Sequence, residues 1–356
     1  MPSSSNLKSG QLTNDELQRC LQHLKSIHPR CTVDPLPAQG GCSFTVSIQH
    51  HDGPSEKTIA QFRPFQFALS PNIMEQAMGV HGALVPRLLS CSTISAPSSD
   101  GRAIQLVEMS KLDGVSFSDL QPKRQLEDEE EEGRLRNMIE GMAAFFTRSW
   151  LAAVEEDGGK RACNGKIGRS IPQRLQHLSL HLPCPDLRRK ATSVLTAVQA
   201  GGLNILPIVL THGDLLPSNI LVNPDDWRVS GIVDWAEGEW LPFGIGLWGV
   251  EHLLGYMSKN GEHGRIGKAE VVYFSRADLL REHFWQGLKR RIPRLEEEVM
   301  ARAVRLARDV GILLWHGFAW DDGRLDRVIN AADDREELAF LEAMLDVAEN
   351  ESRCKL

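Results

Sequence analysis

The chain has 356 residues, of which 42% are hydrophobic and 24% are charged, and its formal net charge is −7. This length suffices for one large domain or two ordinary ones, and the composition is that of a globular protein rather than a disordered or fibrous one. The negative charge, without a basic stripe, argues against a nucleic acid partner. The polar start MPSSSNLKSG and the short apolar runs predict a cytoplasmic protein with no membrane partner.

The cysteine pattern gives no sign of cross-linking or of a zinc site. There are 7 cysteines, an odd number, widely scattered and without a C-x-x-C pair, at positions 20, 31, 42, 91, 163, 184 and 354. Free thiols in a reducing compartment are therefore expected.

The first third of the chain predicts a helix followed by a small sheet. The capping-box pattern from Thr13 to Glu16 and apolar residues at helical spacing predict a helix over about 14–27. Ser70-Pro71 predicts the start of a second helix. A turn at 96–101 would join the last two of four predicted strands, which are at 42–48, 57–62, 88–94 and 103–109.

The chain after Gly114 is mostly helical in its pattern, with helical periodicity at 134–155, at 187–200 and from 269 to the end. The expected fold class is therefore α+β, with two lobes: a small antiparallel-sheet N-lobe and a mostly helical C-lobe. The cleft between them is expected near 108–114. The expected divisions are an N-terminal helical extension at 1–31, the N-lobe at 32–110 and the C-lobe at 111–356.

The stretch HGDLLPSNILVNPDDWRVSGIVDW, at 212–235, predicts a hairpin with polar groups at its mouth. Asp214, Asn219 and Asp234 would meet where the two ends come together. Local capping of turns and strand ends could explain each residue singly, but not the whole set and its spacing. Phosphoryl transfer explains the set, because its catalysis depends on placing metal ions and orienting a hydroxyl. Mg²⁺ prefers such oxygen ligands.

The same stretch resembles the H-G-D-x-x-x-x-N catalytic loop of aminoglycoside phosphotransferases and related small-molecule kinases, which share the protein-kinase fold. IVDW resembles their counterpart of the kinase D-F-G. The resemblance implies that Asp214 accepts the proton of the acceptor hydroxyl and that Asn219 and Asp234 hold Mg²⁺. It also implies that His212 and Gly213 shape the loop, and that ATP is the phosphoryl donor. Gly213 stands where protein kinases place Arg, which favours a small-molecule acceptor.

The resemblance extends over most of residues 32–356 and implies further nucleotide-binding residues. Gly40 and Gly41 stand in the phosphate-covering loop, which lacks a full G-x-G-x-x-G. LVEMSKLDG, at 106–114, resembles the hinge between lobes, where the backbone at Glu108, Met109 and Ser110 would meet adenine. Glu75 lies on the helix where the family places its pairing glutamate, although an exposed helix glutamate would explain the same residue.

The chain departs from the family on the third strand, where IAQFRPF (59–65) contains no lysine. Gln61 stands at the position of the family's lysine, and Arg63 lies two residues further on the same face of the strand. Arg63 could supply the missing positive charge toward the α- and β-phosphates, because arginine stays protonated and binds phosphate as a fork.

Two other sequence patterns do not indicate a binding site. Gly244 to Gly249 match G-x-G-x-x-G but do not open the strand-to-helix turn of a dinucleotide site, so a turn before a packed helix is expected. His177 and His181 have a spacing that suits a metal, but no third ligand is evident, so packing histidines are expected.

The sequence thus predicts an ATP- and Mg²⁺-dependent phosphotransferase that acts on a hydroxyl of a small molecule. Trp235, Glu237, Glu239 and Trp240 would suit an amine-bearing acceptor, although core tryptophans and solvent-facing glutamates would explain them equally. The main alternative is a catalytically silent kinase-fold scaffold that binds nucleotide, supported by the missing lysine. A protein Ser/Thr kinase is a weaker alternative. The acceptor, the choice between ATP and GTP and the oligomeric state are left open.

Overall fold

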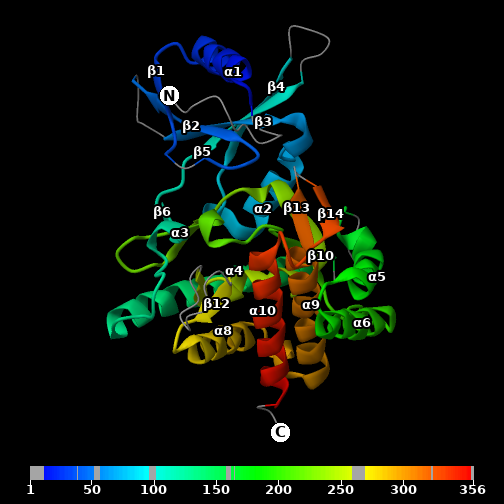
Figure 1. The fold of residues 1–356 in the computed structure, drawn as a ribbon. Coiled ribbons are helices and arrows are strands. Elements are labelled where there is room, and N and C mark those ends of the chain that lie inside the picture. Colours follow the sequence, from blue (N-terminus) through cyan, green and yellow to red (C-terminus); the bar gives the residue numbers. More distant parts are fainter. Residues whose placement is uncertain are drawn as a thin grey trace.

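The structure is a computed structural model that describes residues 12–37, 39–51, 57–95, 102–157, 162–163, 165–258, 269–321 and 324–353. The chain forms two lobes (Figure 1). The N-lobe is a five-stranded antiparallel sheet of order β1-β2-β3-β5-β4 with one helix on its outer face and one below it. Its elements are α1 (Asn14–Ile27), β1 (Cys31–Pro35), β2 (Phe44–His50), β3 (Thr58–Pro64), α2 (Pro71–His81), β4 (Leu88–Ile94) and β5 (Ile104–Ser110).

Helix α1 covers one face of this sheet. It begins with a complete capping box, in which Thr13 and Glu16 bond each other's backbone N–H groups. Its buried residues Cys20 and Leu24 pack in one cluster with strand residues that include Phe62. The side chains of a strand alternate between its two faces, so Gln61 and Arg63 of β3 point to the opposite face, which looks toward the C-lobe.

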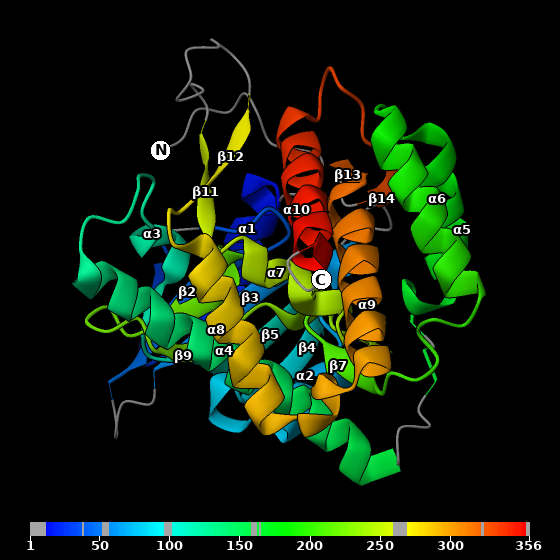
Figure 2. The ribbon, with the colours of Figure 1, turned by 90° about the horizontal axis from the view of Figure 1, so that it is seen from below.

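The C-lobe is mostly helical and lies below the N-lobe in the view of Figure 1. Seen from below, α8 runs beside α4, α9 beside α10, and α5 and α6 lie together at one side (Figure 2). The helices are α3 (Phe117–Leu120), α4 (Glu129–Asp157), α5 (Ile171–His181), α6 (Pro185–Gln199), α7 (Trp248–Glu251), α8 (Ala277–Arg291), α9 (Glu298–His316) and α10 (Arg335–Arg353).

The strands of the C-lobe form small sheets between these helices. Strands β8 and β9 form the hairpin predicted at 212–235 and pair with β6, whereas β7 pairs with β10, β11 with β12 and β13 with β14. Their bounds are β6 (Val115–Ser116), β7 (Ile208–Thr211), β8 (Ile220–Val222), β9 (Val229–Ile232), β10 (Glu239–Pro242), β11 (Gly255–Ser258), β12 (Glu270–Tyr273), β13 (Phe318–Asp321) and β14 (Arg324–Val328).

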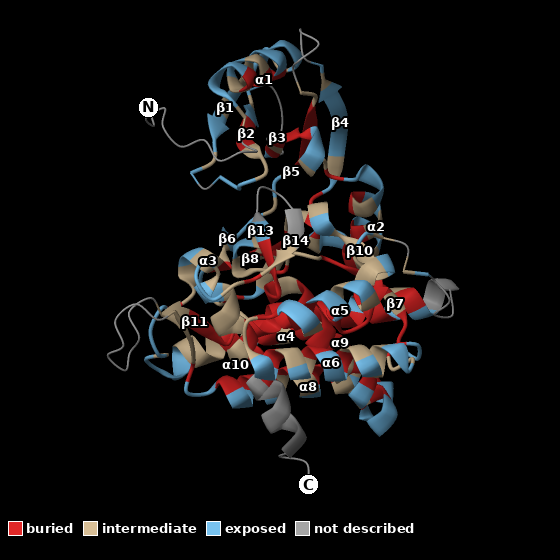
Figure 3. Cartoon of the chain, turned by 45° about the vertical axis from the view of Figure 1, so that its right-hand side comes forward, coloured by how far each residue is buried: buried red, intermediate tan, exposed pale blue. Residues whose placement is uncertain are grey.

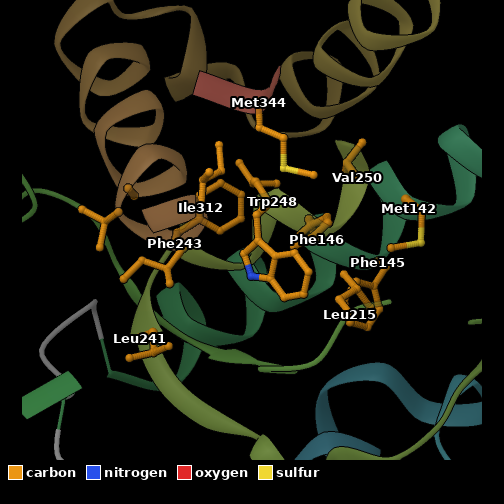
Figure 4. Close-up of a cluster of buried hydrophobic side chains, with 14 of the residues drawn as sticks. Met142, Phe145, Phe146, Leu215, Leu241, Phe243, Trp248, Val250, Ile312 and Met344 are labelled. Atoms are coloured by element: carbon orange, nitrogen blue, oxygen red, sulfur yellow. The ribbon is translucent and has the colours of Figure 1, made fainter. Parts of the chain in front are cut away.

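A large apolar core fills the C-lobe and supports the site above it. Buried residues concentrate between its helices, whereas the N-lobe has a small core of its own (Figure 3). Trp248 lies at the centre of a buried cluster to which Phe145, Ile312 and Met344 contribute from α4, α9 and α10 (Figure 4). Leu215, the residue after Asp214, inserts into the same cluster and is buried. The loop that contains Asp214 is therefore anchored on the helical core.

Most expected elements are confirmed. The helix over 14–27, the four strands and the helix after Ser70 are present within two residues of their expected bounds. The sequence does not indicate strand β1, because this short edge strand has only two apolar residues on its inner face, Cys31 and Val33, and both are only half-buried. The expectation of continuous helix from 269 onward is wrong, since β12, β13 and β14 interrupt it.

The turn and the domain division expected from the sequence stay predictions. The turn at 96–101 lies outside the described residues. The division into an extension and two lobes stays a prediction, and α1, placed in the extension, packs against the sheet of the N-lobe. In the described part of the chain, none of the helices combines the length and the apolar character needed to cross a lipid bilayer.

Candidate functional site

The hairpin brings Asn219 and Asp234 to the same edge of the C-lobe. Strands β8 and β9 pair antiparallel, with Ile220 opposite Ile232, as the sequence predicts. Just beyond the ladder, the N–H of Val233 donates to the carbonyl of Asn219 over 2.9 Å. This bond holds Asp234, the next residue, beside Asn219.

One oxygen of the Asp214 carboxylate is held by Asn219, and the other has no partner in the described part of the chain. The Nδ2 of Asn219 donates to the backbone carbonyl of Asp214 at 2.8 Å and to its Oδ2 at 2.9 Å. Oδ1 of Asp214 is buried and has no hydrogen-bond partner among the residues the structure describes. Burial, and next the charge of Asp234, raise the pKa of Asp214 to about 7. A buried, unpartnered acceptor of this kind suits a hydroxyl from a bound molecule.

His212 ties the two acidic segments together. Its buried ring accepts a hydrogen bond from the N–H of Asp214 at Nδ1, at 3.2 Å, and donates from Nε2 to the carbonyl of Val233, at 2.9 Å. Burial lowers the pKa of His212 to about 4, so the ring is neutral near pH 7. Because both nitrogens are engaged by backbone groups, the structure gives His212 the part of a positioning residue.

The loop geometry depends on glycine at position 213. Gly213 has a φ of +83°, and a Cβ built there would lie 2.1 Å from the carbonyl oxygen of Glu237. Only glycine combines this backbone conformation with so close an approach at low cost. Asp234 is also in the left-handed region, with a φ of 63°. Two successive loops of the site are thus held in unusual backbone conformations.

Arg63 crosses from the N-lobe to the acidic group. It is 1% exposed, and its Nε donates to the carbonyl of Phe67 at 2.8 Å. Its Nη1 donates to Oε1 of Gln61 at 3.0 Å and to Oδ1 of Asp234 at 3.1 Å. The side chain of Gln61 therefore orients the guanidinium of Arg63. Glu75 is exposed on α2, so its pairing with the cation of β3 stays a prediction.

The glycine loop between β1 and β2 meets an aromatic group that the sequence did not indicate. A Cβ on Gly41 would lie 3.9 Å from the ring of Trp320, whereas one on Gly40 would meet Ser43. Trp320 belongs to β13, stacks on Phe67 with ring centroids 6.3 Å apart, and is 51% exposed. No local pattern marks Trp320, because its place follows from the packing of a C-terminal hairpin against the N-lobe.

The adenine contact expected at the backbone of Glu108 and Met109 stays a prediction. Both residues lie inside β5, which is paired with β3 on one edge and with β4 on the other, so their backbone is engaged in the sheet. The carboxylate of Glu108 points to the α1 face, where it contacts His28 and Ser90. The N–H of Ser110 donates to the carbonyl of Arg87 at 2.9 Å, so an adenine contact at Ser110 through its carbonyl stays a prediction.

The expected aromatic and acidic acceptor group is largely structural. Trp235 is fully buried, and Nε1 of Trp240 donates to Gln76 at 2.8 Å. The carboxylate of Glu239 accepts hydrogen bonds from the backbone N–H groups of Ile167 and Gly168, at 3.0 and 2.6 Å. Glu237 is exposed and contributes to the raised pKa of Asp214.

The same regions of the chain match a known family. The sequence pattern of the phosphotransferase enzyme family (APH) covers residues 37–248, which is more than half of the chain and includes the glycine loop, β3 and the hairpin. The chain belongs to this family. No protein with a curated description matches it.

Solved structures with the same fold are distant in sequence. A mutant of aminoglycoside 2′-phosphotransferase IIIa in complex with GDP is 13% identical, covers 94% of this chain and 97% of its own, and has a TM-score of 0.52. Macrolide 2′-phosphotransferase type I is 16% identical, with coverages of 94% and 98% and a TM-score of 0.48. The ethanolamine kinase of Plasmodium vivax is 10% identical, with coverages of 96% and 91% and a TM-score of 0.49.

At these identities the similarity concerns the fold. The predicted two-lobed, protein-kinase-like α+β fold is confirmed, and the family membership makes this protein a small-molecule phosphotransferase in its broad class.

Proposed function

We propose that this APH-family protein transfers the γ-phosphoryl group of ATP, with Mg²⁺, to a hydroxyl of a small molecule. The observation that carries the proposal is the buried carboxylate of Asp214, with Oδ1 unpartnered among the described residues and Oδ2 held by Asn219. A base in this position must be oriented and must have a pKa near the working pH. Asp214 meets both requirements, since its pKa is raised to about 7.

The donor set of the site fits a hard divalent cation. Because Nδ2 of Asn219 is committed to Asp214, Oδ1 is the atom that Asn219 would offer to a metal. With a carboxylate oxygen of Asp234 it makes an oxygen donor pair of the kind Mg²⁺ prefers. When bound, Mg²⁺ neutralises charge on the phosphate oxygens of the nucleotide.

The protein's own residues then have distinct tasks. Asp214 accepts the hydroxyl proton at Oδ1 as the acceptor oxygen bonds to the γ-phosphorus, and the bond from that phosphorus to the β,γ-bridging oxygen breaks. Arg63 offers a permanent positive charge to the phosphates from β3. His212 and Gly213 keep Asp214 and Asp234 in register. The hinge, which starts at Ser110 at the end of β5, would contact the adenine ring of the nucleotide.

The acceptor is proposed to carry an amine that Glu237 attracts. Glu237 is exposed and its charge acts on Asp214, whereas Glu239 is engaged by backbone N–H groups. Trp320, half exposed beside the glycine loop, offers an aromatic face on the N-lobe side. A carboxylate and the face of an aromatic ring each attract a cationic group.

The test combines binding with turnover. The thermal shift of the protein is measured with ATP or GTP, with and without Mg²⁺. The release of nucleoside diphosphate is then measured over a panel of amino sugars, aminoalcohols and neutral alcohols. GTP is included because one structure of similar fold contains GDP. We expect Mg²⁺-dependent stabilisation and turnover that Asp214→Asn abolishes. Stabilisation by nucleotide without turnover of any acceptor would favour the silent scaffold instead, for which the Arg63–Asp234 pair is the supporting observation.

A further inference from the structure

The N-lobe sheet carries a cluster of metal-ligand side chains on the face away from the catalytic group. His28 caps the end of α1, Cys31 begins β1 and His50 ends β2. Cys31 lies opposite His50 in the strand register, so the two side chains share one face of the sheet. One ligand atom from each of the three residues lies within 4.8 Å of the other two.

The contacts within this cluster are those of a nitrogen and sulfur ligand set. Sγ of Cys31 lies 2.9 Å from Nδ1 of His50. The rings of His28 and His50 meet edge to face, with centroids 5.4 Å apart. All three residues are half-buried, which leaves a path for an ion to enter.

Glu108 supports the cluster from the neighbouring part of the sheet. Its Oε2 lies 2.6 Å from Nε2 of His28, and its Oε1 accepts a hydrogen bond from Ser90 at 2.8 Å. An ionised carboxylate only accepts, so Nε2 of His28 is the donor in this contact, and in the neutral ring Nδ1 is then the nitrogen that can bind a metal. Metal-binding histidines commonly donate their second ring N–H to a carboxylate in this way. The side chain of Glu108 is buried, which fits a fixed supporting contact.

We propose that His28, Cys31 and His50 form a zinc site that is separate from the phosphoryl-transfer site. One thiolate and two imidazoles are a ligand set that Zn²⁺ favours, and a water molecule completes a tetrahedron. Binding displaces the proton between Sγ of Cys31 and Nδ1 of His50, so zinc affinity falls as the pH falls. The ion joins the end of α1 to the first two strands and stabilises the N-lobe.

The experiment uses the full chain, freed of metal with a chelator and kept reduced. Zn²⁺ is titrated against a chromophoric competitor, and Co²⁺ is used as a spectroscopic probe. We expect equimolar tight zinc binding, a thiolate-to-cobalt charge-transfer band and the strong visible bands of tetrahedral Co²⁺. Zinc should raise the melting temperature in the absence of nucleotide.

The variants separate a built site from surface binding. Cys31→Ser should abolish the charge-transfer band, and Glu108→Gln should weaken zinc binding by about 10- to 100-fold. The matched controls Cys91→Ser and His23→Asn alter exposed residues of the same lobe outside the cluster and should bind zinc like the unaltered chain. Circular dichroism of the metal-free variants checks that they fold.

Two outcomes overturn the proposal. One is a cobalt complex without a thiolate band in the unaltered chain, and the other is equal zinc binding by Cys31→Ser and the unaltered chain. The cluster would then be a hydrogen-bonded thiol and imidazole group only. Neither outcome bears on phosphoryl transfer, which is assayed separately with nucleotide and Mg²⁺.

Discussion

Nη1 of Arg63 and Oδ1 of Asp234 form an ion pair of 3.1 Å that links β3 of the N-lobe to the turn after β9 in the C-lobe. The guanidinium is almost fully buried, while Asp234 keeps about a third of its side chain exposed to solvent. The pair therefore fixes the cation of β3 next to the proposed metal-binding carboxylate, and it ties the two lobes together at the site.

Replacing Arg63 by Lys should weaken both the fold and nucleotide binding. A single ammonium cannot reproduce bonds to Gln61, Phe67 and Asp234 together, so we expect the free energy of unfolding to fall by about 1–3 kcal/mol. The KM for nucleotide should rise more than kcat falls. Urea unfolding and steady-state kinetics measure these effects.

A matched control for this change is Arg102→Lys. Arg102 also pairs with a carboxylate, that of Glu16, but on the α1 side of the N-lobe. This variant should leave the KM for nucleotide unaltered. Equal changes of KM in the two variants would show that Arg63 acts only through general stability of the lobe.

Asp214→Asn should stabilise the protein at alkaline pH while abolishing turnover. The pKa of Asp214 is raised from 3.8 to about 7 by burial, so the folded state binds this proton more tightly than the unfolded state. The free energy of unfolding therefore falls as the pH rises between roughly 4 and 7. The neutral amide removes this cost, and we expect the gain near pH 8 to exceed the gain near pH 5 by about 1–2 kcal/mol. Thermal unfolding at the two pH values without nucleotide tests this, and an equal gain at both would contradict it.

The activity should rise with pH through the pKa of Asp214. The proposed base works only when ionised, so kcat/KM should fall below about pH 7. Glu237→Gln removes one of the negative charges that raise this pKa. The pH at which kcat/KM falls should therefore be lower in this variant. The profile is measured with a neutral acceptor, so that loss of an attraction for amines does not enter. If kcat/KM fell at the same pH in this variant as in the unaltered chain, the charge of Glu237 would not influence the pKa of Asp214.

Gly213→Ala should damage the site by steric means alone. An added Cβ would lie 2.1 Å from the carbonyl oxygen of Glu237, at a φ of +83°, so we expect a loss of about 2 kcal/mol or more and little turnover. Gly79→Ala is the control, because Gly79 lies on α2 with nothing within 4 Å of a built Cβ. That change should stabilise the chain by about 0.5–1 kcal/mol. Comparable losses in both variants would contradict the assignment.

A buried ionic group holds the C-lobe helices together and should govern acid stability. Glu251 of α7 accepts hydrogen bonds from Arg281 of α8 at 3.1 and 3.0 Å and from Arg308 of α9 at 2.6 Å. Burial by itself raises the pKa of Glu251, but the two guanidinium groups hold it at about 2. Its stabilisation is therefore complete above about pH 4.5 and is lost as the pH falls toward 2.

Glu251→Gln should remove this stabilisation at neutral pH, because it removes the buried negative charge that Arg281 and Arg308 share. We expect a loss of about 3–5 kcal/mol, measured by denaturant unfolding. The exposed pair of Glu298 with Arg302 supplies the control, since Glu298→Gln removes a surface ion pair and should change stability by less than about 1 kcal/mol.

The sequence by itself determined the parts of this protein that depend on neighbouring residues. The capping box of α1, the proline at the start of α2 and the turn residues of the catalytic hairpin act over a few positions, so they can be read along the chain. The hairpin in turn brings Asn219 beside Asp234, and the spacing of these residues with Asp214 carried the family resemblance that the comparison confirmed.

Only the tertiary structure decided which side chains are available for chemistry. In the folded chain the carboxylate of Glu239 accepts hydrogen bonds from backbone N–H groups, Glu108 points toward α1, and Trp320 lies beside the glycine loop. It also gathered His28, Cys31 and His50, which the scattered cysteine pattern did not suggest. The physical reason is that these contacts depend on which strand edges pair and which faces pack, and such long-range choices follow from the burial of the whole core rather than from local sequence.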